Sequence, residues 1–337
     1  MQPASTPLAV IGIGSNSVRL LVATATTDTA HTAHNGPHTT IQALERMETV
    51  TRLAGYDSAP DAGIFRLSSQ AISDTLAAAR HFARRAREMG ALLTAVLATE
   101  AVRAASNRAH LTDALERDLG LPVRVITGEE EATLGWLAIS ASLDYGAGTE
   151  DRHIAVVDIG GGSTDLSVGQ AGAGQPLSTK SLKAGSRTLM QRFSLDRAVT
   201  PDQLRAAMSA LLMEVTLEAV TMRPRPQVAV VIGGTADVLE QVRHTHTHTH
   251  HAHPASDAHS DEPVTRTWLM QWMGRMSGAD MKERVARGVP PDRADVIVAG
   301  AALLLSVLDA WGLRRFYTSK RNILDGFLIK MSSGAYQ

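Results

Sequence analysis

The chain has 337 residues, with 33 Lys and Arg against 34 Asp and Glu, and it contains no cysteine. This length suits two domains, and a hydrophobic fraction of 44% is typical of a globular rather than a disordered chain. The absence of cysteine excludes disulfide scaffolds, thiolate metal centres and cysteine nucleophiles. A net charge of −1 argues against a general nucleic-acid coat, so any anionic ligand must be held by a local site.

No segment has the pattern of a signal peptide or of a membrane span. Residues 1–7 lack the basic start of a signal peptide. The longest apolar run, 296–308, is interrupted by Gly300 and Ser306 and is shorter than a bilayer span. We therefore expect a cytoplasmic protein with no membrane partner.

The hydrophobic pattern of the first half alternates between strand and helix periods. Apolar residues recur at helical spacing over 67–89, where Gly90 provides the stop, whereas 92–98 is a short continuous apolar run typical of a buried strand. The expected strands are 8–13, 18–25, 39–50, 92–98 and 123–126, and the expected helices are 67–89, 107–119 and 129–143.

The second half continues in the same α/β pattern. The expected strands are 155–159, 164–168, 176–182, 227–232 and 315–319, and the expected helices are 186–193, 201–221, 268–285, 294–311 and 323–331. Residues 244–261 form a segment of low complexity, in which 244–253 holds six of the 13 histidines. Such a segment could chelate a borderline metal, but a disordered loop without a catalytic role is the favoured interpretation.

The beginning of the chain recurs near its middle. Residues 9–17 align without gaps on 155–163, and 18–22 align on 164–168. Each copy predicts a strand, a turn of small residues and a second strand. Chance similarity of two buried strands is the alternative, but the shared turn favours two similar domains in tandem, with a linker near 127–129.

Three strand-end turns of small residues are candidate phosphate sites. Backbone N–H groups in such turns approach an anion closely, and a following helix N-terminus adds positive potential. One such turn is weak evidence because most are ordinary turns, but three of them favour phosphate binding. The residues are Gly14, Ser15, Asn16 and Ser17; Gly160, Gly161, Gly162 and Ser163; and Gly233, Gly234 and Thr235.

Several acids are candidates for chemistry. Asp158 ends an apolar strand beside a turn, where a carboxylate suits Mg²⁺, although a turn-capping role is the alternative. Asp165 could be a second acid or an outward strand residue. The acids of 129–131 begin a helix, where they suit the helix dipole, and one of them could instead be a general base for water.

Four cations are candidate phosphate ligands. Arg103 follows the strand 92–98, at the edge where functional loops lie in α/β folds, and a guanidinium matches phosphate oxygens. Arg19, Lys183 and Arg187 are further candidates. For each alone, a solvated surface cation is the simpler interpretation.

Several short motifs together resemble those of one known family. They are 13–19, 98–103 with 106–108, 128–132, 157–165, 233–235 and 293–295. In this order, and over nearly the whole chain, they resemble the exopolyphosphatase / guanosine pentaphosphate phosphohydrolase family of the actin-like ATPase superfamily. The length is similar to that of its short, two-domain members.

The resemblance implies two duplicated ribonuclease-H-like domains with an active-site cleft between them. The domains would be 1–127, joined by a C-terminal helix at about 320–337, and 128–319, which contains the histidine-rich loop. By the resemblance, Glu131 is the catalytic base, Asp158 helps to bind Mg²⁺, Asp165 matches a second acid of the family motif, and Arg103 matches its arginine.

One position departs from the family pattern. Gly12 stands where the family carries Asp, and the internal repeat aligns Gly12 with Asp158. A metal ligand of the first domain is therefore missing, and we expect weaker metal binding and reduced activity. We expect Gly12→Asp to lower the Mg²⁺ requirement.

The resemblance implies Mg²⁺-dependent release of terminal orthophosphate from inorganic polyphosphate, with other divalent cations as possible substitutes. Two alternatives stay open: the same chemistry on guanosine pentaphosphate, and a polyphosphate- or nucleotide-binding protein with little turnover. A homodimer is possible, and no nucleic-acid partner is expected.

Overall fold

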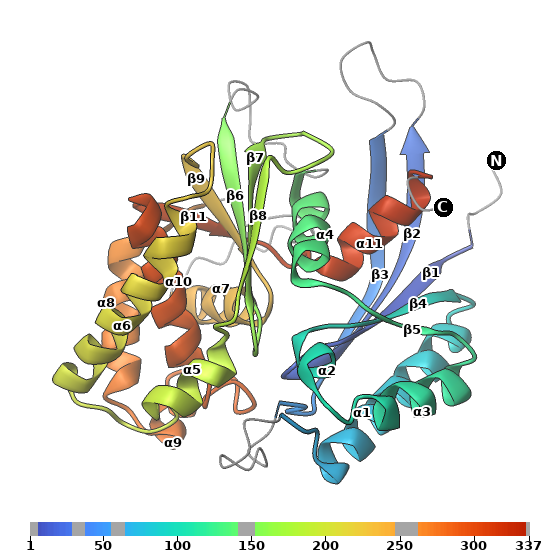
Figure 1. Ribbon diagram of the computed structural model, residues 1–337, viewed down its shortest axis with the longest axis horizontal. Helices are drawn as coiled ribbons and strands as arrows, with labels where there is room; N and C mark the ends of the chain where they lie inside the picture. Colours follow the sequence, from blue (N-terminus) through green and yellow to red (C-terminus); the bar gives the residue numbers. More distant parts are fainter. Residues whose placement is uncertain (1–5, 29–37, 55–64, 141–151, 247–261, 335–337) are drawn as a thin grey trace. The chain divides into compact units, whose positions relative to one another are not determined.

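The computed structural model of the chain describes residues 6–28, 38–54, 65–140, 152–246 and 262–334. The chain divides into two compact units (Figure 1). The first unit combines Met1–Ala141 with Ile323–Gln337, and the second is Ser142–Asn322. The C-terminal helix thus lies in the first unit, and the division falls after Ala141 rather than after residue 127.

A five-stranded sheet forms the frame of the first unit. Its strand order is β3-β2-β1-β4-β5, in which β1, β2 and β3 are antiparallel neighbours and β4 and β5 run parallel to β1. The strands are β1 (Leu8–Ile13), β2 (Ser17–Asp28), β3 (His38–Val50), β4 (Leu92–Ala98) and β5 (Val123–Val125). The helices are α1 (Ser69–Glu88), α2 (Glu100–Ala104), α3 (Ala109–Leu119), α4 (Gly128–Ser140) and α11 (Ile323–Ser332).

The second unit repeats this topology in a six-stranded sheet. Its order is β10-β11-β9-β6-β7-β8, so that β8-β7-β6-β9-β11 corresponds strand for strand to β3-β2-β1-β4-β5. The strands are β6 (His153–Ile159), β7 (Thr164–Gln170), β8 (Ser178–Leu182), β9 (Val228–Ile232), β10 (Val264–Thr265) and β11 (Arg315–Thr318). The duplication predicted from the sequence repeat is therefore a duplication of fold.

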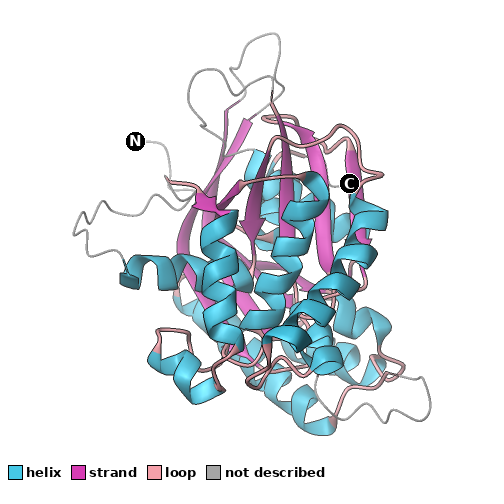
Figure 2. Cartoon of the chain, turned by 90° about the vertical axis from the view of Figure 1, so that its left-hand side faces the viewer, coloured by secondary structure: helices cyan, strands magenta, loops and turns pink. Residues whose placement is uncertain are grey.

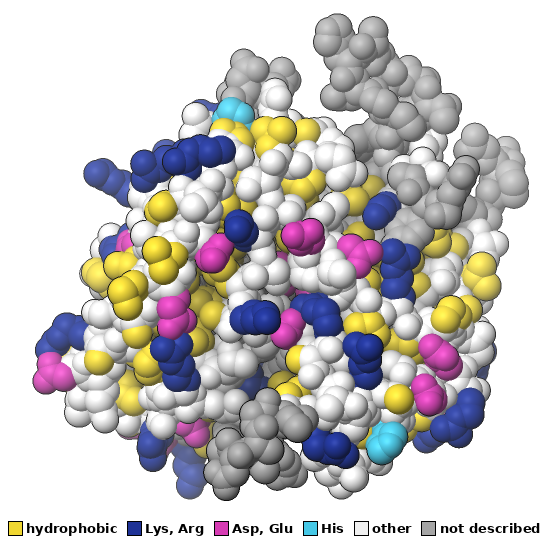
Figure 3. Space-filling model, viewed as in Figure 1, with side chains coloured by type: hydrophobic (Ala, Val, Ile, Leu, Met, Phe, Trp, Pro, Cys, Tyr) yellow, Lys and Arg dark blue, Asp and Glu magenta, His cyan; other side chains and the backbone are white. Residues whose placement is uncertain are grey.

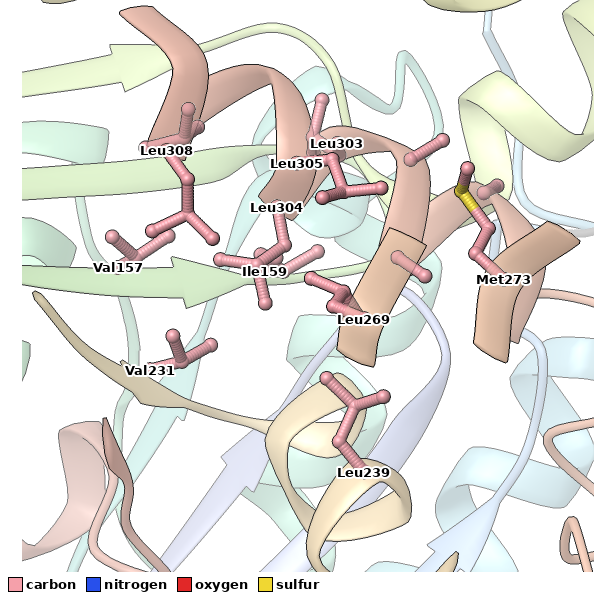
Figure 4. Close-up of a cluster of buried hydrophobic side chains, with 14 of the residues drawn as sticks. Val157, Ile159, Val231, Leu239, Leu269, Met273, Leu303, Leu304, Leu305 and Leu308 are labelled. Carbon is pink, nitrogen blue, oxygen red and sulfur yellow. The ribbon is translucent and has the colours of Figure 1, made fainter. Parts of the chain in front are cut away.

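Helix α10 (Ile297–Trp311) is the centre of the second unit's core. It packs against helices α6 (Pro201–Ala219) and α8 (Arg266–Ser277), and these helices lie in front of the sheet in Figure 2. Figure 4 shows Leu304 and Leu308 beside Val157 and Ile159 of β6. Each fully buried aliphatic side chain contributes about 1.5–3 kcal/mol relative to exposure. The apolar run read from the sequence is thus a core helix.

The remaining helices of the second unit are α5 (Ser186–Phe193), α7 (Gly234–His246) and α9 (Met281–Ala286). The expected single helix 268–285 is wrong, because Gly278 caps the end of α8 and Asp280 begins α9. Asp280 accepts a hydrogen bond from the backbone N–H of Glu283 at 2.8 Å, and the Glu283 carboxylate accepts from the Asp280 N–H at 3.0 Å. This reciprocal capping box starts a new helix.

Buried Arg284 joins α9 to the segment that precedes α10. Its side chain is fully buried and donates to four backbone carbonyl oxygens. They belong to Met276, Leu195, Ala294 and Arg197. Burial lowers the pKa of Arg284, and Asp196, Asp280 and Asp295 oppose that effect. These bonds fix residue 294, which is adjacent to Arg293, a residue that contacts the third turn described below.

Helix α4 belongs to the first unit because it packs tightly against α11. A Cβ atom added at Gly326 would lie 1.8 Å from the backbone oxygen of Leu134, so the two helices approach closely. The end of the expected helix 129–143 falls outside the described residues. None of the helices in the described ranges is both long and apolar enough to cross a bilayer.

Charged side chains of both signs are interspersed on the face shown in Figure 3. The net charge of the whole chain is nevertheless only −1. A polyanionic ligand would therefore depend on local donors rather than on the overall field.

Candidate active site

The first small-residue turn, Gly14–Ser17, joins β1 to β2. The backbone N–H of Gly14 donates to the Ser17 oxygen at 2.9 Å. The N–H groups of Thr51 and Arg52 donate to the Asn16 oxygen at 3.0 and 2.9 Å, and that of Ala54 donates to the Ser15 oxygen at 2.9 Å. The carbonyl groups of Ser15 and Asn16 are thus bonded to the segment after β3, and these bonds fix the conformation of the turn.

The second turn, Gly160–Ser163, has the same backbone geometry. Gly160 N–H donates to the Ser163 oxygen at 3.0 Å, and a Cβ atom at Gly160 would lie 3.1 Å from that oxygen, as it would in the equivalent pair Gly14 and Ser17. The N–H groups of Ser186 and Arg187 donate to the Gly160 and Gly161 oxygens, each at 2.9 Å. The repeat therefore extends to the hydrogen bonds of the turns.

Gly185 allows helix α5 to start directly against the second turn. A Cβ atom at Gly185 would lie 2.4 Å from the backbone of Gly161, a distance that no side chain tolerates. Glycine at this position is therefore a requirement of the close approach of two backbones.

The third turn, Gly233–Thr235, also depends on glycine. Gly233 has a φ of 83°, and a Cβ atom there would lie 2.5 Å from Asp158 Oδ1. A Cβ atom at Gly234 would lie 2.7 Å from Arg293 Nη1. The turn thus brings a carboxylate and a guanidinium against the N-terminus of α7.

Asp158 and Asp165 form a pair of carboxylates on neighbouring strands. They are direct partners in the antiparallel register of β6 and β7, so their side chains share a face of the sheet. Asp165 is only 2% exposed, and Ser163 Oγ donates to its Oδ2 at 3.2 Å. Asp165 is therefore a buried acid at the start of β7, next to the turn, rather than an outward strand residue.

The pair suits a hard divalent cation. Mg²⁺ prefers oxygen ligands and usually keeps several waters, so one or two carboxylates plus substrate oxygens suffice. Within the described residues, no three His, Asp or Glu side chains gather into a complete metal cage. Mg²⁺ requires fewer protein ligands than such a cage provides, so two acids beside a turn of the phosphate-binding type suffice.

The first unit has no such pair at the equivalent positions. There the register partners are Gly12 and Arg19. Arg19 Nε lies 3.0 Å from Glu48 Oε1, and Ser17 Oγ donates to the same oxygen at 2.5 Å. Glu48 of β3 was not a candidate from the sequence; only the pairing of β2 with β3 reveals it.

The three consecutive acids at the start of α4 have different environments. Glu130 forms a capping box with Thr127: its N–H donates to Thr127 Oγ1 at 3.1 Å, and its carboxylate accepts from the Thr127 N–H at 2.8 Å. That backbone hydrogen bond, aided by Arg124, lowers the pKa of Glu130. Glu129 is exposed, whereas Glu131 is buried.

Glu131 lies beside Arg103. The Arg103 guanidinium is 3.8 Å from Glu131 Oε2, and it also donates to the Ile126 oxygen and to the Glu100 carboxylate. Glu100 was not predicted as a site residue; it lies one turn before Arg103 on α2, a helix that the sequence analysis missed. A buried carboxylate next to an anchored guanidinium is an arrangement suited to proton transfer at an anionic substrate.

The other two predicted cations differ in accessibility. Lys183 is exposed just after β8. Arg187 is fully buried and pairs with Asp295 at 3.2 Å, an arrangement that stabilises the second unit's interior. This burial argues against the predicted contact of Arg187 with a phosphate chain. Arg293, quoted only as part of a motif, lies instead at the third turn.

Comparisons with known proteins agree with this arrangement. The Ppx/GppA phosphatase family model matches residues 30–333. Three solved structures cover nearly the whole chain. A Ppx/GppA member from Aquifex aeolicus is 23% identical, with 98% of this chain and 99% of that chain covered and a TM-score of 0.73.

The other two structures give slightly higher TM-scores. An exopolyphosphatase from Cytophaga hutchinsonii is 20% identical, with 98% of both chains covered and a TM-score of 0.78. An exopolyphosphatase-like protein is 24% identical, with 98% of this chain and 100% of that chain covered and a TM-score of 0.78. These likenesses show the fold, which is that of two ribonuclease-H-like domains.

Proposed function

Because this chain belongs to the Ppx/GppA phosphatase family, we propose that it is an exopolyphosphatase that hydrolyses the terminal phosphoanhydride bond of inorganic polyphosphate. The observation that carries the proposal is the burial of Glu131, whose Oε2 lies 3.8 Å from the Arg103 guanidinium. The preceding acid of α4, Glu130, instead caps the helix. Guanosine pentaphosphate is the second candidate substrate.

Glu131 acts as the general base. Its carboxylate accepts a proton from a water molecule as the water oxygen forms a bond to the terminal phosphorus. The bond from that phosphorus to the bridging oxygen breaks, and the shortened chain leaves with the electron pair. Burial keeps the carboxylate in one orientation. A base held in the orientation needed for proton transfer accelerates the reaction, because no further ordering is required in the transition state.

Each unit offers one of the two equivalent turns as a proposed phosphate-binding site, and the cations are further proposed ligands. Backbone N–H groups of the Gly14–Ser17 and Gly160–Ser163 turns suit non-bridging phosphate oxygens. Arg103 is anchored by the Ile126 oxygen and by Glu100, so its fork is preorganised for a phosphate. Arg19 and exposed Lys183 are the proposed ligands for phosphates farther along the chain.

Asp158 and Asp165 are the proposed Mg²⁺ ligands, and Ser163 orients Asp165. When bound, the ion supplies neutralisation of the negative charge on the phosphates. Other divalent cations that accept oxygen ligands can take the same place.

The proposal is tested by phosphate release from three substrates. Initial rates are measured for long-chain polyphosphate, guanosine pentaphosphate and ATP, each with and without Mg²⁺. We expect the highest kcat/KM for polyphosphate and a requirement for the cation. A higher kcat/KM for guanosine pentaphosphate would favour the second candidate, and binding of polyphosphate without turnover would indicate a binding protein.

A further inference from the structure

The chain carries a pair of exposed arginines just before strand β9 and another pair where β11 begins. Arg223 and Arg225 precede β9, and Arg314 and Arg315 lie at the start of β11. The two strands are parallel neighbours, so both pairs lie at the amino edge of the sheet. Figure 3 shows Lys and Arg side chains in a row over this edge, at the upper left of the molecule. We call these four residues the arginine edge.

Contacts between the two segments show that the pairs form one cluster. Arg225 Nε donates to the backbone oxygen of Trp311 at 3.1 Å, where α10 ends. A Cβ atom added at Gly312 would lie 3.0 Å from Arg225 Nη2. Gly312 is separated from Arg314 by a single residue. The arginine edge is therefore a single concentration of positive charge.

The acids nearest to these arginines in the sequence already have other partners. Glu218, which precedes the first pair, lies 3.1 Å from Lys180. Asp309, which precedes the second pair, accepts hydrogen bonds at both of its carboxylate oxygens from Arg266. Neither acid is therefore available to neutralise the arginine edge.

Helix ends offset only part of the charge. Helices α6 and α10 both end beside this edge, and a helix C-terminus carries roughly half an elementary negative charge. Arg223 donates to the oxygen of Val220, the C-cap of α6, as Arg225 does to the end of α10. Within the described part of the chain, the side chains of Arg314 and Arg315 donate to no acceptor. Two helix ends thus offset about one of the four positive charges.

We propose that the arginine edge is a second binding site for a polyphosphate chain, separate from the candidate active site. The Gly160–Ser163 and Gly233–Thr235 turns follow the carboxyl ends of β6 and β9, whereas the arginine edge lies at the amino ends of β9 and β11. The five residues of β9, at about 3.3 Å each, separate the two places by about 16 Å. This inference rests on the proposed function for the identity of the ligand.

The chemistry of the edge favours a ligand made of phosphate alone. A guanidinium fork matches phosphate oxygens. Proteins that bind single-stranded nucleic acids add aromatic side chains on which the bases stack. The aromatic residues of the segments 220–228 and 311–318 are Trp311 and Phe316, which are buried, and Tyr317, which is half-buried. The edge therefore offers charge without an exposed surface for stacking.

A second site acts only on chains that are long enough to use it. A long chain held at the arginine edge keeps its end at a high effective concentration near the rest of the protein. Tripolyphosphate is too short to extend from the arginine edge to the turns. The arginine edge is therefore expected to affect the affinity for long chains and not the chemical step.

Binding is tested by isothermal titration of long-chain polyphosphate in the Glu131→Gln background, over a series of KCl concentrations. We expect Arg314→Gln/Arg315→Gln to raise the Kd about fivefold. We expect it also to reduce the slope of log Kd against log salt by about 1.4, which is about 0.7 for each phosphate contact, as for a single nucleic-acid strand. The matched control Arg275→Gln/Lys282→Gln removes two exposed charges from α8 and α9 of the same unit and should leave both quantities unchanged. Equal Kd values for the two variants would overturn the proposal.

Kinetics separate a second site from an effect at the active site. We expect Arg314→Gln/Arg315→Gln to raise KM for long-chain polyphosphate about fivefold with kcat unchanged, and to leave KM for tripolyphosphate within about twofold. An equal rise of KM for both substrates would place the arginines at the active site and overturn the proposal. Loss of single-stranded RNA binding with unchanged polyphosphate binding would also overturn it.

The titration does not require turnover. If the Kd depends on Arg314 and Arg315 but the wild type releases no orthophosphate, then the proposed function fails while this inference stands. If polyphosphate is hydrolysed but its Kd does not depend on these arginines, then this inference alone fails.

Discussion

Neighbouring acids of one helix turn can differ completely in what they do. At the start of α4, Glu130 caps the helix through Thr127, Glu129 is exposed, and Glu131 is buried beside Arg103. Their charges are the same, so burial and partners distinguish them. This contrast provides a matched control for the catalytic proposal.

We predict that Glu131→Gln lowers kcat for phosphate release by about 100-fold or more, because the amide cannot accept the proton of the attacking water. KM should change little, since the substitution is nearly isosteric. The matched variant Glu129→Gln removes the same charge from the exposed face two residues earlier and should keep the wild-type rate. Equal rates for wild type and Glu131→Gln would remove Glu131 from the mechanism.

For single residues, the sequence predicts those whose role depends on their place within one strand or helix. Asp158 follows as a candidate from its place at the end of an apolar strand, whereas Glu131 is singled out among the acids of 129–131 only by the resemblance to the family. The burial of Arg187 could not be predicted, because its partner Asp295 is 108 residues away in the chain. Glu48 was missed for the same reason, since its contact with Arg19 exists only after β2 and β3 pair.

Besides its packing against α4, helix α11 is linked to β3 by a charged pair of unequal exposure, Asp325 with Arg46. The Asp325 side chain is 1% exposed, whereas its partner Arg46 is 24% exposed. A buried carboxylate that loses its partner keeps its desolvation penalty. The strength of the attachment therefore depends on Arg46.

We predict that Arg46→Ala lowers the free energy of unfolding by about 3 kcal/mol, the loss typical when one member of a buried ion pair is removed. Chemical denaturation measures this change. Arg85→Ala is the matched control, because Arg85 pairs with the more accessible Glu45, the residue adjacent to Arg46, and its loss should cost only a small fraction of that amount. Similar losses for the two variants would show that burial of Asp325 is not what matters.

Glu240 links α7 to β11 and makes stability depend on pH. Burial raises its pKa, but hydrogen bonds from Thr318, Arg243 and His244 together with the charge of Arg243 outweigh burial, so the pKa is lowered from the ordinary value of 4.5. A group with a lowered folded-state pKa contributes stability above its unfolded value and loses it as the pH falls through the folded value.

We therefore predict that the stability difference between wild type and Glu240→Gln is largest above the ordinary pKa of 4.5 and shrinks as the pH falls below it, through the lowered pKa of the folded state. Urea unfolding at a series of pH values measures it. Glu214→Gln, in an exposed pair with Arg192, is the control and should show little pH-dependent difference. A difference that grows on acidification would contradict the assigned role of Glu240.

The boundaries of helices and strands were predicted well where the local hydrophobic pattern is strong. They were predicted poorly where a short connection determines whether one helix ends and another begins. Strands β1, β4 and β9 follow from continuous apolar runs, and α10 from its apolar length. The break between α8 and α9 depends on one cap at Asp280. The unit boundary at Ala141 depends on the packing of α4 against α11, about 190 residues apart in sequence, which no local pattern reveals.

The whole molecule is a fold used twice with different chemistry at equivalent positions. The two sheets share a topology and the two turns share hydrogen bonds. Yet one strand pair carries Asp158 and Asp165, and the other carries Gly12 and Arg19. Duplication was therefore predictable from the sequence, whereas the packing of Leu324 against Gly12 was not, because the two residues lie near opposite ends of the chain.

The histidine-rich segment lies mostly outside the described residues. Its alternating His and Thr composition, from 244 to 253, lacks the apolar side chains that a core requires. We predict that replacing 247–261 with a short Gly/Ser linker leaves phosphate release and Tm unchanged. A large loss of either, measured by malachite-green assay and thermal melting, would indicate a structural or metal-binding role.

The central claim is that this protein removes phosphates from the end of a polyphosphate chain, and phosphorus NMR of that reaction tests it most directly. The resonances of orthophosphate, terminal groups and internal groups are followed while purified enzyme acts on long-chain polyphosphate with Mg²⁺. Our account predicts that orthophosphate grows at the expense of internal groups from the first time point, and that Glu131→Gln abolishes this growth. An early rise in terminal groups, which signals internal cleavage, or the absence of any orthophosphate, would contradict it.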